Sequence, residues 1–313
     1  MSGRRLATID IGTNTVILLV AELNVTIGLH FLDDRAEITR LGEGVDRTGI
    51  LGAEGQNRTL NALRGYCERC RSLNVEEIRV AGTSALRDAA NAGDFRNRLK
   101  RELNLDLRVL SPQEEAGYSY LAVQRGLPLG AKELLVVDVG GGSTEFIWGT
   151  DGELHRWASF QMGTVRLTER FLFSDPVREE ECTQLASAVD DELGGVLADW
   201  KTETVFDVMV GIAGTFTTLS AVKKALIRYL PDEVHGSFLN REEIQRQLRN
   251  FKGKTIAERR EIRGLEPKRA DVILAGSLLV DRIMEFFHME RVVVSDQGIR
   301  HGLLYDRFER RHG

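Results

Sequence analysis

The stretch Glu133-Leu134-Leu135-Val136-Val137-Asp138-Val139-Gly140-Gly141-Gly142-Ser143-Thr144-Glu145-Phe146-Ile147-Trp148 decides the fold of this chain. Leu134–Val137 is apolar at every position, which predicts a strand buried on both faces, and the glycines that follow predict a hairpin. Because glycine has no Cβ, the N–H groups of Gly140–Gly142 can converge on an oxygen-rich ligand, and the hydroxyls of Ser143 and Thr144 add donors. This pattern predicts a phosphate-binding turn.

Two carboxylates flank the turn, one on each side. Asp138 ends the first apolar run, and Glu145 lies near the start of the second. Carboxylate oxygens are the ligands that Mg²⁺ prefers when it accompanies phosphates. A glycine-rich hairpin that joins two core strands without a ligand is the alternative, but its glycines would then lower conformational order for no purpose. The stretch therefore predicts a phosphate-and-metal site.

A second stretch, near the N-terminus, repeats the same order of features. Leu6–Ile9 is typical of a strand, Asp10-Ile11-Gly12-Thr13-Asn14-Thr15 of a hydroxyl-rich turn, and Val16–Ala21 of the next strand. The aspartates Asp10 and Asp138 are 138 − 10 = 128 residues apart, which indicates a duplicated domain plan. Two such domains would place their phosphate-binding hairpins on opposite walls of one cleft.

Length and composition agree with two globular domains. At 313 residues the chain exceeds the size at which one hydrophobic core usually stops growing, and 42% apolar with 28% charged residues is ordinary for a globular protein. No run of about 18 apolar residues exists, and the apolar stretch at the N-terminus is too short for a signal peptide. We therefore expect a cytoplasmic protein without a membrane partner.

Net charge and cysteine usage exclude further classes. A net charge of −5 disfavours general nucleic-acid binding, although local arginines can still bind a polyanionic substrate. Three cysteines, an odd number, argue against a disulfide framework. Cys67 and Cys70 form a single C-x-x-C in a stretch with a helical pattern, which favours two neighbours on a helix over a metal or redox pair.

Strand and helix patterns alternate along the chain, which predicts an α/β fold with a mixed sheet in each half. Arg125–Gly130, which contains two glycines and a proline, is the expected boundary or hinge and gives domains 1–125 and 126–302. A charged helix at about 303–313 is expected to pack back on the first domain. Further strands are expected at 75–81, 107–110, 205–210 and 291–294, and helices at 54–73, 116–124, 179–200 and 269–287.

Several polar groups lie where an expected strand ends and a helix begins, the position at which open α/β sheets usually bind ligands. Thr83, Ser84 and Arg87 form one such group, and a helix cap is an equally good interpretation of the two hydroxyls. Glu115 lies in the first turn of a helix, where a carboxylate is normally only a partner of the helix dipole.

Further candidates lie beyond the central stretch. Arg166 suits bidentate contact with phosphate, and Gly214 with Thr215 opens a helix whose N-terminus suits phosphate or a nucleotide. His235 is isolated in the sequence, and a lone histidine is more often structural than functional.

Taken together, these stretches resemble the exopolyphosphatase/guanosine pentaphosphate phosphohydrolase (Ppx/GppA) family, within the acetate-and-sugar-kinase, Hsp70 and actin superfamily. They run from Asp10 to Gly302, nearly the whole chain, and although one Asp-x-Gly turn is a weak signal, the ordered set is highly specific. The matching stretches are Asp-Ile-Gly-Thr-Asn-Thr at 10–15, Gly-Thr-Ser-Ala-Leu-Arg at 82–87, Glu-Glu-Ala at 114–116, Asp-Val-Gly-Gly-Gly-Ser-Thr-Glu at 138–145, Gly-Thr-Val-Arg-Leu-Thr-Glu at 163–169, Gly-Ile-Ala-Gly-Thr-Phe-Thr-Thr at 211–218 and Ser-Asp-Gln-Gly-Ile-Arg-His-Gly at 295–302.

The resemblance implies two actin-like (ribonuclease H-like) domains with mixed sheets flanked by helices and an active-site cleft between them. It implies an exopolyphosphatase that hydrolyses the terminal phosphoanhydride of inorganic polyphosphate and releases orthophosphate. Glu115 matches the family position of the base that activates the attacking water. Asp138 and Glu145 would hold Mg²⁺, or another divalent cation, directly or through water.

The resemblance also implies roles for residues that hold the substrate. The residues expected to bind phosphate are Gly12, Thr13, Asn14, Thr15, Arg87, Gly140, Gly141, Gly142, Ser143 and Thr144. Weaker candidates for guiding the substrate away from the reaction centre are Arg166, Gly214, Thr215, His235, Arg269, Arg300 and His301.

Two features depart from the family pattern. Ile17 occupies a position at which the first turn usually has an Arg or a His, so one phosphate contact is expected to be missing. Longer members have a C-terminal helical region with a His-Asp metal motif, whereas this sequence has no His-Asp pair and resembles the short two-domain form.

Other functions stay open at this stage. Guanosine pentaphosphate 5′-phosphohydrolase activity is the main alternative, because that substrate presents the same terminal phosphoanhydride. A sugar or acetate kinase would need an acceptor site, an actin- or Hsp70-like ATPase module would need a partner domain, and a non-catalytic sensor of guanosine tetra- or pentaphosphate or of polyphosphate would not need three carboxylates. A homodimer is compatible with the sequence, which does not distinguish exposed faces from interface faces.

Overall fold

The computed structural model describes residues 4–24, 28–130 and 132–309. The chain divides into two compact units: unit 1 comprises Met1–Ala122 and Ile299–Gly313, and unit 2 comprises Val123–Gly298. The boundaries expected from the sequence lie a few residues later, at 125/126 and 302/303. Across the described ranges, no helix combines the length and apolar composition that crossing a membrane requires.

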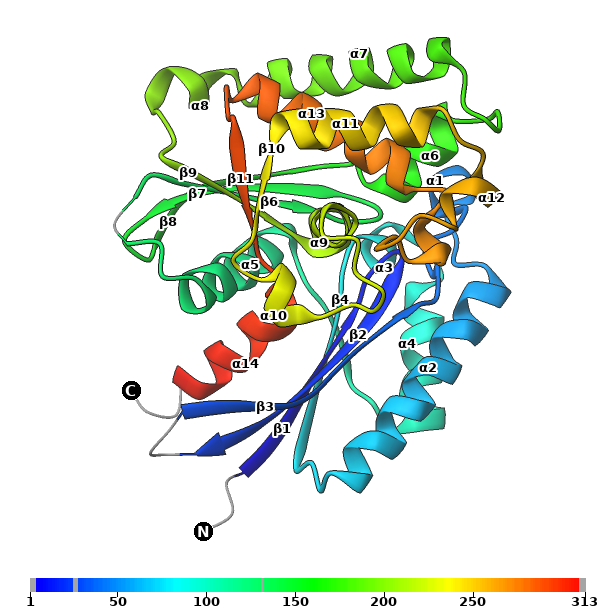
Figure 1. Ribbon diagram of the computed structural model, residues 1–313. Coiled ribbons are helices and arrows are strands. Elements are labelled where there is room, and N and C mark those ends of the chain that lie inside the picture. The colour runs from blue at the N-terminus through cyan, green and yellow to red at the C-terminus, as the bar shows by residue number, and fades with distance from the viewer. Residues whose placement is uncertain (1–3, 25–27, 131, 310–313) are drawn as a thin grey trace. The chain divides into compact units, whose positions relative to one another are not determined.

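Unit 1 is built on a mixed five-stranded sheet in the order β3-β2-β1-β4-β5 (Figure 1). Its strands are β1 (Arg4–Ile11), β2 (Thr15–Asn24), β3 (Gly28–Ile38), β4 (Glu77–Gly82) and β5 (Leu107–Val109). The first three strands are antiparallel neighbours, whereas β4 and β5 continue the sheet parallel to β1. The mixed sheet that the sequence predicted for this half is confirmed.

The central strands of this sheet are apolar at successive positions because helices cover both faces. Ile9 belongs to a buried cluster with α2 (Ala53–Ser72) and α4 (Ala92–Leu103). Leu6, which points to the other face, belongs to a cluster with α14 (Ile299–Glu309). Figure 1 shows the pair α2 and α4 on one side of the sheet and α14 on the other.

Three further helices of unit 1 are short or lie at its end. They are α1 (Val45–Thr48), α3 (Ser84–Asp88) and α5 (Pro112–Gly126). Helix α5 passes from unit 1 into unit 2 between Ala122 and Val123.

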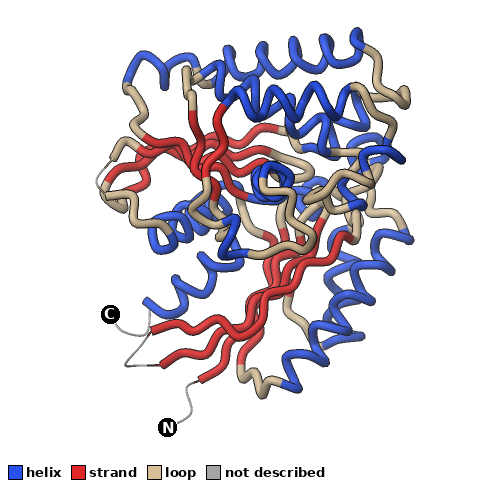
Figure 2. The backbone as a smooth tube through the Cα atoms, viewed as in Figure 1, coloured by secondary structure: helices blue, strands red, loops and turns tan. Residues whose placement is uncertain are grey.

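Unit 2 is built on a mixed six-stranded sheet in the order β10-β11-β9-β6-β7-β8 (Figure 2). Strands β6, β7 and β8 are antiparallel neighbours, while β9 and β11 run parallel to β6, and β10 is antiparallel to β11. The strands are β6 (Leu134–Val139), β7 (Thr144–Thr150), β8 (Glu153–Phe160), β9 (Val208–Ile212), β10 (Phe238–Asn240) and β11 (Arg291–Val294).

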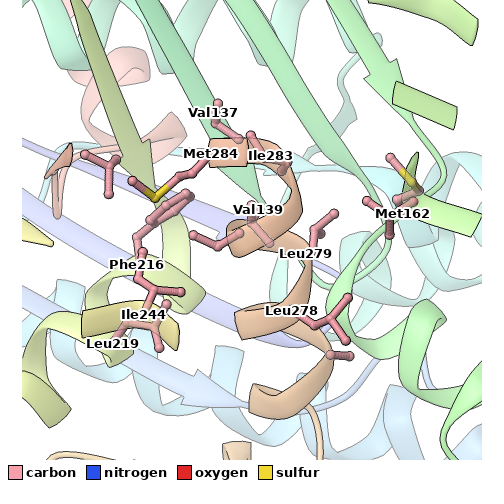
Figure 3. Close-up of a cluster of buried hydrophobic side chains, with 14 of the residues drawn as sticks. Val137, Val139, Met162, Phe216, Leu219, Ile244, Leu278, Leu279, Ile283 and Met284 are labelled. Carbon is pink, nitrogen blue, oxygen red and sulfur yellow. The ribbon is translucent and has the colours of Figure 1, made fainter. Parts of the chain in front are cut away.

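The core of unit 2 lies between this sheet and helix α13 (Ile273–Phe286). Figure 3 shows Val137 and Val139 of β6 on one side and Leu279 and Ile283 of α13 on the other. Eleven of the fourteen residues of α13 are buried, as expected for a helix that is largely apolar. Other helices that pack into this core include α6 (Thr164–Phe171), α7 (Glu179–Val196), α9 (Ala213–Lys223) and α11 (Arg241–Lys252).

The segment predicted as one helix at 179–200 forms two helices, so the predicted C-terminal end of that helix was wrong. Helix α7 stops at Val196, and α8 (Ala198–Glu203) follows. Leu197 between them leaves helical geometry at φ −103° and ψ 4°, just after two consecutive glycines that weaken the last turn of α7.

The last two predicted helices also differ at their starts. The helix predicted at 269–287 begins only at Ile273, because a 3₁₀ turn, Pro267–Arg269, precedes it. The helix predicted at 303–313 begins at Ile299, and its residues 310–313 lie outside the described residues. Two short helices complete unit 2, α10 (Pro231–Val234) and α12 (Ile256–Arg259).

Both sheets follow the same plan, as the repeated Asp-x-Gly turns predicted. In each sheet an antiparallel β-meander comes first in the sequence, and later strands are added parallel to its first strand. The parallel strands β1, β4 and β5 therefore end at one edge of the first sheet, and β6, β9 and β11 end at one edge of the second. Ligands of open α/β sheets usually bind at such carboxyl edges.

Candidate phosphate-binding and metal-binding site

The hairpin that joins β6 and β7 carries both carboxylates of the central stretch. Asp138 and Glu145 are direct partners across the two antiparallel strands, so their side chains point to the same face of the sheet. The turn between them is closed by a hydrogen bond from Gly140 N to Ser143 O at 3.0 Å.

The N-terminus of α6 fixes the orientation of this turn, because its N–H groups donate hydrogen bonds to the carbonyl groups of the turn. The carbonyls of Gly140, Gly141 and Gly142 accept hydrogen bonds from the N–H groups of Thr164 (2.9 Å), Val165 (2.9 Å) and Gly163 (3.1 Å), respectively. In a trans peptide the N–H group points opposite to the C=O group. The next three N–H groups, those of Gly141, Gly142 and Ser143, therefore point away from α6, and no described residue accepts from them. They form a set of free donors suited to an oxyanion.

Close contact between α6 and the turn explains two residues of this region. A Cβ on Gly163 would lie 2.2 Å from the backbone carbon of Gly141, so only glycine fits there. The guanidinium Nε of Arg166 donates to Gly142 O at 2.9 Å. Arg166, a candidate substrate guide, thus holds the turn itself.

Asp138 and Glu145 are buried, with 7% and 1% of their surface exposed. Like charges placed directly opposite on neighbouring strands destabilise a sheet, and burial increases that cost. Ser159 offsets part of it, since its hydroxyl donates to Glu145 Oε1 at 2.8 Å. A divalent cation between the carboxylates would offset more, so the donor set fits Mg²⁺. Among the described residues, no group of three or more His, Cys, Asp or Glu side chains is arranged to hold a metal ion.

The hairpin that joins β1 and β2 has the same backbone design. Asp10 pairs with Ile17, seven positions later, as Asp138 pairs with Glu145. Gly12 N donates to Thr15 O at 3.0 Å, the counterpart of the bond that closes the other turn. The segment after β3 takes up the carbonyls of this turn: Thr13 O accepts from Gly42 N at 2.8 Å, and Asn14 O accepts from the N–H groups of Thr39 and Arg40, each at 3.0 Å.

Glu115, in the first turn of α5, is 5% exposed and paired with Arg87. The Nη1 atom of Arg87 lies 2.5 Å from Glu115 Oε2 and also donates to Leu110 O at 3.1 Å. Burial raises the pKa of the Glu115 carboxyl, and the positive charge of Arg87 acts in the opposite direction. A carboxylate with a raised pKa is a stronger base than an exposed one, which suits proton abstraction from water.

Backbone hydrogen bonds bring this pair to the same edge of the unit 1 sheet as its hairpin. Thr83 N donates to Ile11 O at 3.3 Å, and Arg87 N donates to Thr83 O at 3.2 Å. Leu110, which accepts from Arg87, donates its own N–H to Gly82 O at 2.9 Å. Asp10, Arg87 and Glu115 thus follow the ends of three adjacent parallel strands.

At the corresponding edge of unit 2, the structure brings together the consecutive candidates Gly214 and Thr215 and the distant candidate Arg269. A Cβ on Gly214 would lie 2.1 Å from Nη1 of Arg269, so this guanidinium lies directly on the N-terminus of α9. The hydroxyl of Thr215 donates to Val139 O, next to Asp138, at 3.4 Å. Burial lowers the pKa of Arg269.

Other candidates have contacts that favour a structural role. His235 Nδ1 accepts from Asp296 N at 3.2 Å, and its Nε2 lies 3.0 Å from Gly126 O, so the ring connects two segments of unit 2. Arg300 forms a two-point ion pair with Asp34, at 3.2 and 2.9 Å. The ring of His301 packs edge-on against Phe31. Through these contacts, Arg300 and His301 of α14 pack against β3 of the unit 1 sheet.

Three residues that build the turns were not predicted from the sequence. Gly42 and Gly163 allow the close approach of the segments that bind the turn carbonyls, and Ser159 supports Glu145. Gly163 begins the stretch 163–169 that resembles the family, and this resemblance could have identified it. Gly42 and Ser159 act through contacts with distant residues, which the local sequence pattern does not show.

Two sheets with one common plan, each with an Asp-x-Gly hairpin at its carboxyl edge, define an actin-like, two-domain α/β protein. The sequence profile of the Ppx/GppA phosphatase family matches residues 19–311. The chain belongs to this family.

Individual relatives agree with that membership. The chain is 33% identical to Exopolyphosphatase 2 of Mycobacterium tuberculosis, over 97% of this chain and 98% of the relative. It is 29% identical to a guanosine-5′-triphosphate,3′-diphosphate pyrophosphatase of Vibrio atlanticus, over 96% of this chain but only 58% of the longer relative. The crystal structure of an exopolyphosphatase from Cytophaga hutchinsonii superposes with a TM-score of 0.91 at 28% identity, over 98% of both chains.

Proposed function

We propose that this phosphatase is an exopolyphosphatase that removes the terminal phosphate of inorganic polyphosphate. The observation that carries the proposal is the set of three outward N–H groups at Gly141–Ser143, next to the buried carboxylate pair Asp138 and Glu145. Such donors bind the oxygens of a terminal phosphate without any side chain. The relative from M. tuberculosis that matches along nearly its whole length is named an exopolyphosphatase, which supports this substrate class.

Hydrolysis of a phosphoanhydride depends mainly on alignment and on neutralisation of charge. The outward N–H groups of Gly141–Ser143 would hold oxygens of the terminal phosphate. Asp138 and Glu145 would hold Mg²⁺, which when bound would supply positive charge to the phosphate oxygens. Arg87 contributes a guanidinium N–H to a phosphate oxygen.

Glu115 acts as the general base. The oxygen of a water molecule attacks the terminal phosphorus, the bond from that phosphorus to the bridging oxygen breaks, and one proton of the water passes to the Glu115 carboxylate. The products are orthophosphate and a chain shortened by one phosphate, whose new end keeps the bridging oxygen. The ion pair with Arg87 orients Glu115 for this transfer.

A second candidate function is hydrolysis of guanosine pentaphosphate at its 5′ end. It is favoured by the relative from V. atlanticus, whose name describes action on that nucleotide. The same hairpins would hold its terminal phosphate, so the two substrates differ only in the part of the molecule attached to that phosphate. A purely binding protein gains nothing from three buried carboxylates, and a kinase would transfer phosphate to an acceptor instead of releasing it.

The test is Mg²⁺-dependent release of phosphate from long-chain polyphosphate and from guanosine pentaphosphate, measured with wild type and Glu115→Ala. We expect release from polyphosphate by the wild type and a loss on the order of 1,000-fold in the variant, with polyphosphate still bound. Preference for the nucleotide would select the second candidate function. Binding of both compounds without release by the wild type would reject the hydrolase and favour a sensor.

A further inference from the structure

Asn14 is the least explained polar residue of unit 1. Its surface is 5% exposed, yet neither the oxygen nor the nitrogen of its carboxamide has a hydrogen-bond partner. Leaving a buried polar group without a partner costs about 1–3 kcal/mol, so native proteins rarely keep one without a reason. Its backbone carbonyl is already used, since Asn14 O accepts two hydrogen bonds from the segment after β3. The side-chain amide is the part of Asn14 whose missing partners need an explanation.

A comparison within the structure shows that this amide is unusual. Asn91, at the start of α4, has its amide satisfied on both sides by Leu51, which donates its N–H to Asn91 Oδ1 at 2.8 Å and accepts from Nδ2 at 3.1 Å. Gly142 occupies the position of Asn14 in the second hairpin and has no side chain at all. The backbone design of the turn thus does not require an amide there.

The two unpaired atoms restrict the ligand. The carboxamide oxygen is an acceptor and needs a donor, whereas the nitrogen is a donor and needs an acceptor. A fully ionised phosphate oxygen satisfies the nitrogen but repels the carboxamide oxygen. A water molecule satisfies both, because it can donate to the oxygen and accept from the neighbouring N–H in one closed arrangement.

We propose that the Asn14 carboxamide holds and orients the water molecule that attacks the terminal phosphate. The inference rests on the proposed function, to which it adds the residue that positions the nucleophile. The hairpin and the base are joined by the bonds from Thr83 to Ile11 and from Arg87 to Thr83, with Arg87 paired to Glu115. Asn14 is thus a positioning residue, and Glu115 remains the base.

The test compares Asn14→Ala and Asn14→Asp with Asn91→Ala in the full chain, using phosphate release from polyphosphate with Mg²⁺. For Asn14→Ala we expect kcat to fall on the order of 100-fold with KM within about twofold, because a water position is lost and substrate binding is kept. Its melting temperature should stay at or above that of the wild type, since the amide removed has no partner in the protein. Asn91→Ala should show the reverse, with normal kcat and a lower melting temperature.

Asn14→Asp supplies a signature that a structural role would not produce. An ionised carboxylate offers acceptors only, whereas a protonated one offers one donor and one acceptor, as the amide does. The activity of Asn14→Asp relative to wild type should therefore rise as the pH falls from about 8 to about 5, while the ratio for Asn14→Ala stays flat. The charged residues nearest to Asn14 are Asp10 in the same hairpin and Arg40, whose N–H donates to Asn14 O. Both are present in every variant, so they do not account for a difference between the variants.

The outcomes separate the two proposals. A wild type that releases no phosphate from either substrate rejects the proposed function, and the inference falls with it. An active wild type with unchanged kcat in Asn14→Ala rejects only the inference. A higher KM with normal kcat also rejects it, because Asn14 would then be a ligand of the phosphate.

Discussion

The two hairpins of this protein have the same backbone and different side chains. Each has an aspartate at the end of its first strand, a turn closed by one hydrogen bond of 3.0 Å, and turn carbonyls bonded to the segment that follows the third strand. Opposite the aspartate, however, the first hairpin has Ile17 and the second has Glu145. Only the second hairpin therefore pairs two carboxylates, and only the first has an amide, Asn14, in its turn. The comparison shows that the backbone of the turn is shared, whereas the carboxylate pair and the turn amide are divided between the two hairpins. Under the proposed function, the shared backbone would bind phosphate, and the two copies would divide metal binding and water positioning.

The largest effect is expected from making the second hairpin resemble the first. In Glu145→Ile we expect phosphate release to fall on the order of 1,000-fold, because one of two metal ligands is lost. Without Mg²⁺ the variant should melt at a higher temperature than wild type, since the repulsion with Asp138 is removed. Melting curves with and without Mg²⁺ test this, because Mg²⁺ should stabilise the wild type and not the variant. Equal stabilisation of both proteins would mean that the carboxylate pair is not the metal site.

A smaller effect is expected from crowding the segments that bind the turn carbonyls. A Cβ on Gly163 would meet backbone atoms of Gly141 at 2.2 Å, whereas a Cβ on Gly42 would meet the side-chain methyl of Thr13 at 2.3 Å. Backbone cannot move aside as a side chain can, so Gly163→Ala should lower the free energy of unfolding by about 3 kcal/mol and Gly42→Ala by about 1 kcal/mol. Urea unfolding of the two variants measures the difference. A greater loss in Gly42→Ala would contradict the assigned contacts.

The base in unit 1 predicts a pH dependence. Burial raises the pKa of Glu115, and Glu115 must be ionised to accept a proton, so activity should be lost as the pH falls through that raised pKa. Arg87 favours the ionised form, so Arg87→Met should move this acidic limb to higher pH. Profiles of kcat against pH for the two proteins give the shift. A limb that moves to lower pH, or stays in place, would remove Glu115 from the role of base.

The smallest effect is expected from placing a charged side chain opposite Asp10 in the first hairpin, where Ile17 lies. Ile17 is partly exposed, so a longer side chain can be accommodated there. Ile17→Arg adds a cation where the resemblance leads us to expect one, and KM for polyphosphate should fall about tenfold with little change in kcat. Ile17→Leu is the matched control and should leave KM unchanged. If the arginine raised KM, the first hairpin would not contact the substrate through this position.

Local sequence was enough to predict the strands of both hairpins and the repeated plan of the sheets. Hydrophobic runs such as Leu134–Val137 are buried on both sides, and the turn residues determine where each strand ends. The family resemblance then named Glu115, which its own position in a helix would not have separated from an ordinary helix-dipole partner. Its burial and its pairing with Arg87 are visible only in the folded unit.

The parts that sequence could not predict depend on contacts between distant residues. Nothing local shows that Arg166 would bind the carbonyl of Gly142, or that Arg300 would pair with Asp34. The start of α13 was placed too early, because the 3₁₀ turn before it has the same composition as a helix start. The orphaned amide of Asn14 is likewise a property of its surroundings, since the sequence marks the residue but not its missing partners.

The outward N–H groups of Gly141–Ser143 also have a consequence for how the family can diversify. A main-chain donor is encoded by no particular residue, so under the proposed function few point mutations would remove its contact with the terminal phosphate. Variation can then accumulate in the side chains farther from the reaction centre, which meet the remainder of the substrate. If the proposed function holds, a grip made of main-chain donors would allow a substrate change from polymer to nucleotide without loss of terminal-phosphate binding.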